Sequence, residues 1–336
     1  MIGAHTAAEL HSAPGVVAAL LDRLDAEADV LAGSVSGGVL FVGCGSSHLI
    51  GGIAAALLRR RAGVAAEAVV ASEAAYDPAA ARGSVRRTVV AVSRSGRTSE
   101  TLAAVAATRR AGPVHVIALV CDGDSPLATA ADTVVAMPEA AEKAIAQTRS
   151  TAAALAFAVL LAERAAGRDG RPGLRRAAAQ LARWRDGWAA GAQALAVSVG
   201  EGRLVLLGSA ERWWLAREAV LKVTEMARVA AVAERVLEVP HGPIEGIRPD
   251  DTVVVLPAPE GKLGRIEEGV VRRLRSLVDR VVVVGEDTFT AGTDSGEPLL
   301  AQLHGVHLLA LALATARGID ADRPVRLTPH VSLDDA

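Results

Sequence analysis

Short runs of consecutive apolar residues alternate along the chain with longer stretches in which apolar residues recur every three or four positions. In the first half the apolar runs are Val39–Val42, Thr88–Val92, Val114–Leu119 and Thr133–Met137. Helical periodicity follows the first two, reaching Arg61 after one and spanning Thr98–Arg110 after the other. Continuous Val-rich runs separated by helices are typical of a parallel sheet covered on both faces. The pattern therefore predicts a doubly wound α/β architecture.

The same pattern begins again in the second half of the chain. Leu204–Gly208 corresponds to Leu40–Gly43, and Thr252–Leu256 to Thr88–Val92, each about 164 positions later. Val281–Val284 likewise corresponds to Val116–Leu119. We therefore predict an α/β fold of two tandem domains, each a doubly wound parallel sheet flanked by helices. The expected boundaries are an N-terminal helical segment 1–29, domains at 30–165 and 185–325, a linker at 168–173 and a tail at 326–336.

The composition argues against several classes of protein. The 336 residues carry a formal net charge of −2, so there is no electrostatic bias toward nucleic acid or an anionic membrane. The two cysteines, Cys44 and Cys121, provide neither a disulfide framework nor a metal-ligand spacing. The most apolar stretch, Thr151–Ala162, is too short to span a bilayer, and the first residues lack the features of a signal peptide. His304 and His307 lie on an apolar helix without a third ligand, so we expect no metal site. The cysteines, the missing membrane span and the missing signal-peptide features together lead us to expect a cytoplasmic protein.

A loop rich in hydroxyl groups, Ser93–Thr98, follows the second apolar run and leads into a helix. Ligands of doubly wound sheets bind beyond the carboxyl ends of the strands, where a helix N-terminus offers free N–H groups and partial positive charge. Ser93, Ser95 and Thr98 add hydroxyl donors, and Gly96 allows close approach of the backbone. Such hydroxyls can also simply cap a helix. Three of them around a glycine favour a phosphate site.

A second loop, Gly43–Ser47, follows the first apolar run with the sequence Gly-Cys-Gly-Ser-Ser. Its Gly-x-Gly also fits the start of a dinucleotide-binding fingerprint, but His48 stands where the third glycine is required. A tight turn from strand to helix explains both glycines. The equivalent loops of the second half, Gly208–Glu211 and Pro257–Glu260, are poor in hydroxyls. The predicted phosphate chemistry therefore belongs to the first domain alone.

The second half contributes charged groups on one face of a predicted helix. Glu218, Lys222 and Glu225 stand at positions i, i+4 and i+7. A solvated face with an ion pair would show the same spacing. Lysine is scarce, however, with three among the 36 lysines and arginines, which favours a specific role for Lys222. His241 follows in a rigid Pro-His-Gly-Pro turn that presents an imidazole from a loop.

Taken in order, these motifs resemble those of the SIS (sugar isomerase) domain proteins. The Cys-Gly-Ser-Ser loop, the Ser-x-Ser-Gly-x-Thr loop, the Glu-x-x-x-Lys-x-x-Glu helix and the His-Gly-Pro turn occur there in the same sequence. The likeness is to the isomerase half of glucosamine-6-phosphate synthase and to stand-alone deaminases and ketose/aldose isomerases. It covers nearly the whole chain.

The resemblance implies a role for each matching residue. Those expected to hold the substrate phosphate are Ser47, Ser93, Arg94, Ser95, Gly96 and Thr98. Those expected beside the sugar are Cys44, Gly45, Ser46, Glu142, Ile145 and Ala146. Glu225 would carry a proton between C1 and C2, and Lys222 would assist at the reacting oxygens. His241 would open the sugar ring from the neighbouring subunit of a homodimer. This set supplies the base, the cation and the acid–base group that an enediol mechanism needs, without a cofactor.

The resemblance implies an enzyme that converts a hexose or hexosamine 6-phosphate between aldose and ketose, with ammonia release as an added step for an amino sugar. A non-catalytic sugar-phosphate regulator and an NAD-dependent enzyme are the alternatives. Arg94 and Arg97 stand where the family often has Gln and Glu. Pro329 stands where the synthase has a lysine that reaches the open-chain sugar, and Arg326 and His330 are candidate replacements. The sequence leaves open the sugar epimer, the C2 substituent and the direction of reaction.

Overall fold

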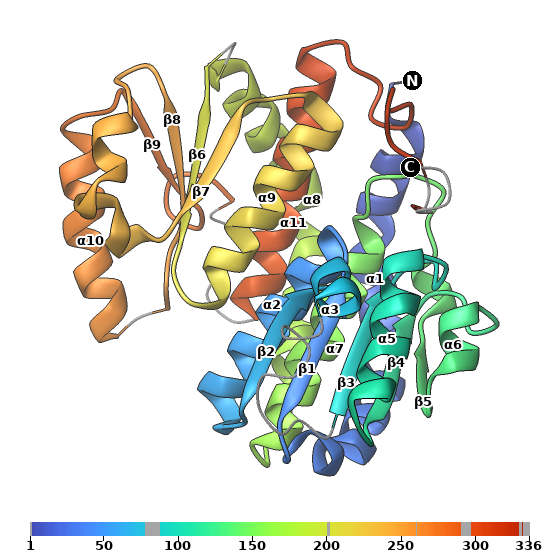
Figure 1. The fold of residues 1–336 in the computed structure, drawn as a ribbon. Helices are drawn as coiled ribbons and strands as arrows, with labels where there is room; N and C mark the ends of the chain where they lie inside the picture. Colours follow the sequence, from blue (N-terminus) through green and yellow to red (C-terminus); the bar gives the residue numbers. More distant parts are fainter. Residues whose placement is uncertain are drawn as a thin grey trace. The chain divides into compact units, whose positions relative to one another are not determined.

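The structure is a computed structural model that describes residues 2–77, 88–199, 202–259, 261–289, 297–328 and 331. The chain divides into two compact units, each with its own parallel sheet (Figure 1). The first-sheet unit comprises residues 12–175 and the chain end from residue 326. The second-sheet unit comprises residues 1–11 and 176–325. The α/β class with parallel sheets that the sequence predicts is thus confirmed.

Five parallel strands form the first sheet, in the order β2-β1-β3-β4-β5. Their bounds are β1 Val39–Gly43, β2 Ala66–Val70, β3 Thr88–Ser93, β4 His115–Val120 and β5 Thr133–Ala136. Every residue of β1 and β3 is buried, as their continuous apolar runs predict. The edge strand β2 is not evident from the apolar runs, because it mixes buried and partly exposed residues.

Four parallel strands form the second sheet, in the order β7-β6-β8-β9. Their bounds are β6 Leu204–Gly208, β7 Ala231–Glu234, β8 Thr252–Leu256 and β9 Arg280–Val283. The order repeats that of β2-β1-β3-β4, so β8 holds the position in its sheet that β3 holds in the first. Here too the edge strand, β7, is not evident from the apolar runs.

Helices cover both faces of each sheet. In the first-sheet unit they are α1 Ala4–Val35, α2 Ser46–Leu57, α3 Ala71–Tyr76, α5 Ser99–Ala111, α6 Pro126–Ala130 and α7 Arg149–Ala165, with α1 starting in the other unit. Those of the second are α8 Arg171–Val199, which begins in the first unit, α9 Glu211–Ala227, α10 Lys262–Arg275 and α11 Pro298–Ala316. A π-helical turn extends α2 over Leu58–Ala62, and 3₁₀ segments span Pro138–Ala140, Val236–His241 and Pro243–Gly246.

The cores lie between these helices and the Val-rich strands. Leu40, Val42, Val89 and Ala91 pack with residues of α3, α5 and α6 on one face of the first sheet. The opposite face of the sheet meets α2, where Gly51 allows close contact with the Phe41 side chain of β1. In the second-sheet unit, α10 packs on one side of the sheet while α9 packs on β6 and β7 and against α11 (Figure 1). Each sheet is therefore buried on both faces.

The turns that follow β1 and β6 share an unusual backbone conformation. Gly45 has φ 53° and ψ −130° immediately before α2, and Ala210 has φ 53° and ψ −122° immediately before α9. Ala210 follows Gly45 by 165 positions. A positive φ is costly for a residue with a side chain. The second turn therefore keeps its shape against the preference of alanine.

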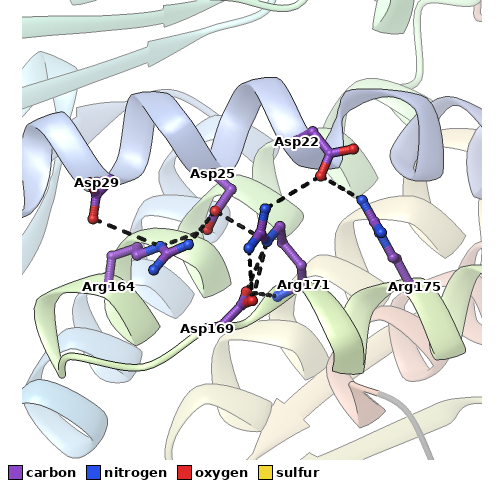
Figure 2. A network of polar contacts seen from close by, with 7 residues as sticks. All are labelled: Asp22, Asp25, Asp29, Arg164, Asp169, Arg171 and Arg175. Atoms are coloured by element: carbon purple, nitrogen blue, oxygen red, sulfur yellow. Dashed lines mark hydrogen bonds and ion pairs between the residues drawn. The ribbon is translucent and has the colours of Figure 1, made fainter.

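An ion-pair network fixes the connection between α7 and α8 against α1 within the first-sheet unit (Figure 2). Arg164 Nε donates to Asp25 Oδ1 at 2.8 Å, and Arg171 Nε lies 3.2 Å from Asp25 Oδ2. Arg171 also pairs with Asp169 at 2.9 Å. Hydrogen bonds from the Arg171 side chain and backbone hold the pKa of Asp169 at about 2. The segment interpreted as a linker is therefore short, since α8 already begins at Arg171.

One helix in the described part of the chain, α11, has the length and apolar composition of a membrane span. Within this unit 78% of its apolar window is buried. It contacts α9 and contributes buried leucines, among them Leu299, Leu303 and Leu313, to the core. Its apolar character is accounted for by this packing.

Candidate functional site

The turn after β1 brings one group of predicted residues to the carboxyl end of the first sheet. Gly45 adopts its positive φ, and α2 begins directly after it at Ser46. Ser46 and Ser47 are both buried. Gly43 has no space for a side chain, because a Cβ there would lie 2.9 Å from the Val92 carbonyl oxygen. The turn therefore lies directly against the end of β3.

The loop between β3 and α5 is held by its own hydroxyl groups. The Gly96 N–H donates to Ser93 Oγ at 3.1 Å, and the Arg97 N–H donates to Ser95 Oγ at 3.2 Å. Ser93 Oγ lies 3.4 Å from Thr98 Oγ1. The loop thus gathers three hydroxyl groups at the N-terminus of α5.

A small polar cavity of about 40 Å³ is lined by residues of both loops. Its lining consists of Cys44, Ser47, Val92, Ser93, Arg94, Ser95, Thr98, Thr101 and Gln147. Ser47 lies in the first turn of α2, Thr98 is the residue before α5, and Gln147 lies two residues before α7. Three helix N-termini therefore adjoin the cavity. The positive ends of their dipoles favour an anion. At α7 the first N–H groups already donate to the Glu142 carboxylate.

The predicted phosphate residues gather at this cavity, apart from Gly96, which is buried in the loop. Of the residues predicted beside the sugar, Cys44 lines the cavity, whereas Gly45 and Ser46 shape and bury the turn next to it. Ile145 and Ala146 belong to the segment that leads to Gln147 and are not part of the lining that the structure describes. The two loops are therefore brought together as expected for an anion site.

Glu142 serves the start of α7. Its side chain is fully buried, and Oε1 accepts hydrogen bonds from the Thr148 N–H at 2.7 Å and the Arg149 N–H at 2.6 Å. Oε1 also accepts from Thr148 Oγ1 at 2.9 Å, and Oε2 accepts from Ser150 Oγ. These donors include N–H groups that the first turn of a helix leaves free. The carboxylate is thus engaged within the protein, although the resemblance implies a position beside the sugar.

Arg94 links the loop after β3 to the segment before α7. Its Nη1 donates to the carbonyl oxygens of Ala144 at 2.8 Å and Ile145 at 3.1 Å, and lies 4.0 Å from Glu142 Oε2. Arg97 instead pairs with Asp122 at 2.8 Å on the surface. Of the two arginines that depart from the family pattern, Arg94 therefore places positive charge at the cavity.

The cysteine thiols of this unit are protonated at neutral pH. Burial, with a smaller contribution from the Glu100 carboxylate, raises the pKa of Cys44 to about 11. Burial likewise raises the pKa of Cys121 to about 12. A nucleophilic cysteine requires a lowered pKa. Cys44 can therefore contact a ligand but is not an activated nucleophile.

The second group of predicted residues lies on α9 in the second-sheet unit. Lys222 is 1% exposed, and its Nζ donates to Glu225 Oε2 at 2.6 Å and lies 3.7 Å from Glu218 Oε1. Glu218 is fully buried, whereas the Glu225 side chain keeps 19% exposure. The solvated-face interpretation is therefore wrong for Lys222 and Glu218. Glu225 is the member of the cluster that a ligand can reach.

A histidine of α11 completes this buried cluster. His307 Nε2 lies 3.3 Å from Glu218 Oε1, and the His307 side chain is 1% exposed. His304, one turn earlier, stays neutral, because burial and the nearby His307 lower its pKa to about 3. Among the residues that the structure describes, no group of histidine, cysteine and carboxylate side chains is arranged to hold a metal ion. His307 therefore acts as a partner of Glu218.

The other predicted catalytic residue, His241, ends the 3₁₀ segment that follows β7 and is exposed on its own unit. The position expected for a lysine, Pro329, and its neighbour His330 lie outside the described residues. Arg326 is described and exposed.

Several site residues were missed by sequence reasoning. Thr101 and Gln147 line the small polar cavity between the two loops, and His307 contacts Glu218. Thr101 follows Thr98 by three positions, one turn along α5, and this spacing is a usable signal. Gln147 and His307 come from segments distant in sequence, so only the fold brings them to their places.

Residues 34–164 match the SIS domain family model. The glutamine–fructose-6-phosphate aminotransferase (isomerizing) of Aeropyrum pernix is 30% identical over 97% of this chain, which spans 57% of that protein. AgaS of Streptomyces coelicolor, provisionally named a D-galactosamine-6-phosphate deaminase, is 29% identical over 95% of this chain and 91% of its own length.

The fold is shared with a solved structure of a glucosamine-6-phosphate deaminase from Thermotoga maritima. The two superpose with a TM-score of 0.81 over 97% of this chain and 99% of the other, at 23% identity. At that identity the likeness establishes the fold.

Proposed function

Because residues 34–164 match the SIS domain family model, we propose that the chain is an isomerase or isomerising deaminase of a hexose or hexosamine 6-phosphate. The observation that carries the proposal is Glu225, a reachable carboxylate held at 2.6 Å by the buried ammonium of Lys222. A carboxylate next to a fixed cation suits proton transfer at a carbon beside a carbonyl. The deaminase and aminotransferase names of the relatives support the same substrate class.

The second-sheet unit is, in this proposal, a second copy of the SIS domain. Its strand order repeats that of the first sheet, and its β6–α9 turn repeats the backbone conformation of the β1–α2 turn. The copies have diverged in the loops that follow β3 and β8. The first copy has Ser93–Thr98 there, and the second has Pro257–Gly261. The hydroxyl-lined cavity thus belongs to one copy and the charged helix to the other.

The substrate phosphate is assigned to the cavity of the first-sheet unit. Ser47, Ser93, Ser95 and Thr98 supply hydroxyl donors, the adjoining helix N-termini supply the positive ends of their dipoles, and Arg94 adds positive charge. Hydrogen bonds to a charged phosphate are stronger than neutral ones.

The reaction begins with ring opening, assigned to His241 of the neighbouring subunit in a homodimer. Glu225 then takes the proton from C2 of the open-chain aldose and returns it to C1, while Lys222 stabilises the developing oxyanion. With an amino group at C2, the same transfer yields a ketimine. Water adds to the ketimine carbon, and ammonia leaves to give the ketose phosphate.

The test is to incubate the full chain with glucosamine 6-phosphate, galactosamine 6-phosphate, or fructose 6-phosphate plus ammonia, and to follow ammonia and the aldose-to-ketose ratio. We expect turnover with at least one of these. Ser95→Ala and Thr98→Ala should each weaken sugar-phosphate binding about tenfold, which corresponds to about 1.4 kcal/mol. Ser99→Ala, a hydroxyl of the same helix outside the cavity lining, should bind normally.

Binding without turnover of any of these phosphates would favour the non-catalytic regulator over the enzyme. Unchanged binding in both Ser95→Ala and Thr98→Ala would remove the phosphate site from the proposal.

A further inference from the structure

A large cavity lies at the carboxyl end of the second sheet. Its position corresponds to that of the Ser93–Thr98 loop in the first sheet. Its volume is about 640 Å³, within the range of small-molecule sites. Its lining comes from the ends of β8 and β9 and from α10: Val255, Pro257, Ala258, Gly261, Gly264, Arg265, Glu267, Glu268, Val271, Arg272, Arg275, Val283 and Glu286. We call it the β8 cavity. Ligands of doubly wound sheets bind at this edge.

A buried carboxylate lines the β8 cavity. Glu267 is 3% exposed, and its Oε2 accepts a hydrogen bond from the Ala258 N–H at 3.0 Å. Its Oε1 is buried and has no partner among the residues that the structure describes. Leaving a buried acceptor unmatched costs about 1–3 kcal/mol, and more for a charged group. The carboxylate therefore lacks one hydrogen-bond donor, which a ligand that enters the cavity and reaches Oε1 would supply.

A second buried acceptor belongs to a side chain that bonds to the same segment after β8. Gln302 of α11 is 5% exposed, and its Nε2 donates to the Pro257 carbonyl oxygen at 3.3 Å. Its Oε1 is buried without a partner in the described part of the chain. Gln302 lines an adjoining cavity of about 240 Å³ that shares Pro257, Ala258 and Glu286 with the β8 cavity. Two acceptors thus flank one loop, each at a cavity.

The charges of the β8 cavity balance. Arg265, Arg272 and Arg275 are matched by Glu267, Glu268 and Glu286. Arg275 also pairs with Asp287 at 2.9 Å. Without an excess of positive charge this site does not select a phosphate, in contrast to the cavity of the first-sheet unit. The buried acceptors instead select donors.

We propose that the β8 cavity is a second ligand site, which takes a small amine carrying hydroxyl groups, of which an unphosphorylated amino sugar is the representative. An ammonium group in the β8 cavity offers Glu267 Oε1 a charge-assisted hydrogen bond, and a hydroxyl group that extends into the adjoining cavity donates to Gln302 Oε1. The site is separate from the residues assigned to the isomerase reaction. It gives the second sheet a binding function of its own.

The test measures binding of glucosamine to the full chain by titration calorimetry and by saturation-transfer NMR. Glu267→Gln, which keeps the shape of the side chain, should weaken binding about tenfold, since a charge-assisted bond is lost. Gln302→Met should weaken it about threefold. Glucose, with a hydroxyl in place of the amine, should bind at least about tenfold more weakly than glucosamine.

Ser95→Ala and the exposed Glu245→Gln are the controls, and both should bind glucosamine as the parent does. Thermal melting confirms that each variant is folded, and the two cavity variants are independent of each other. Undetectable binding of glucosamine overturns the proposal. So does equal affinity of the parent, Glu267→Gln and Gln302→Met. Loss of binding in Ser95→Ala, or glucose binding as tightly as glucosamine, also overturns it.

Discussion

Lys222 shows how a single side chain can orient the candidate base. Removing an ammonium group from water costs several kcal/mol unless it is paired. The Lys222 ammonium is paired with two carboxylates, Glu225 at 2.6 Å and Glu218 at 3.7 Å. His307 contacts Glu218 in turn at 3.3 Å. The result is a buried set of alternating charges that ends at one reachable carboxylate. The orientation of Glu225 is therefore fixed by groups behind it.

Adding a single methyl group at Gly96 should lower the free energy of unfolding. Its φ is 63°, and a Cβ would lie 2.0 Å from Ser125 Oγ and 2.4 Å from Ser125 Cβ. We expect Gly96→Ala to lower the free energy of unfolding by about 1–3 kcal/mol in urea titrations. Gly33→Ala is the matched control, since Gly33 lies inside α1 with nothing within 4 Å of a Cβ. That change should stabilise by about 0.5–1 kcal/mol; equal effects at both sites would contradict the steric argument.

His304 should make stability depend on pH. Burial lowers its pKa from 6.5 to about 3, so between these values the unfolded chain binds a proton that the folded chain does not. The free energy of unfolding should therefore fall as the pH decreases from 6.5 toward 3, by up to about 1.4 kcal/mol per pH unit from this group. His304→Gln should remove that part of the slope in denaturation curves measured from pH 7 to pH 4. Equal slopes in the parent and the variant would rule out His304 as its source.

The residue types of the candidate site could be read from the sequence, because hydroxyls after a strand and charges on one helix face leave local patterns. The partners of these residues could not. Glu142 follows the family motif, yet its carboxylate accepts hydrogen bonds from Thr148 and Arg149 at the start of α7. Which donors a carboxylate meets depends on the path of the chain between them, and spacing does not record that path.

At the scale of elements, α7 depends on one buried side chain. Glu142 accepts hydrogen bonds from two backbone N–H groups and two hydroxyls at its start. We expect Glu142→Ala to lower the free energy of unfolding by about 3 kcal/mol, because these buried donors lose their acceptor. Glu139→Ala is the control: it removes an exposed carboxylate paired with Arg23 at 3.2 Å. Its effect should stay within about 0.5 kcal/mol in the same titrations. Similar losses for both would show that Glu142 is not a helix-terminal anchor.

The apolar pattern predicts the central strands and one edge strand of each sheet, β5 and β9, but it misses the other edge strand of each sheet, β2 and β7. β1 and β3 are buried along their whole length and read as unbroken apolar runs. β2 and β7 have exposed positions and carry polar residues such as Glu67 and Glu234. An edge strand needs fewer apolar side chains, so its sequence resembles that of a loop. The apolar composition of α11, which is also that of a membrane span, reflects its burial in the core of its unit.

At the scale of the whole molecule, the proposed catalysis requires an assembly of two chains. Co-expressing Glu225→Gln and His241→Ala chains with different affinity tags, and purifying on both tags in succession, isolates mixed dimers. If His241 serves the neighbouring subunit, one of the two sites in a mixed dimer keeps both side chains. Activity should then be about half that of the parent, although each variant alone is inactive. Inactive mixed dimers, or a monomer that is fully active, would contradict the shared histidine.

The central claim is that Glu225 moves a proton between adjacent carbons of a sugar phosphate. Deuterium exchange measures this directly: fructose 6-phosphate is incubated with the protein in D₂O, and loss of the C1 proton signal is followed by NMR. We expect exchange by the parent and by Glu245→Gln, and a decrease of about 10²–10⁴-fold in Glu225→Gln, with sugar-phosphate binding retained. Exchange at the parent rate in Glu225→Gln would contradict this claim.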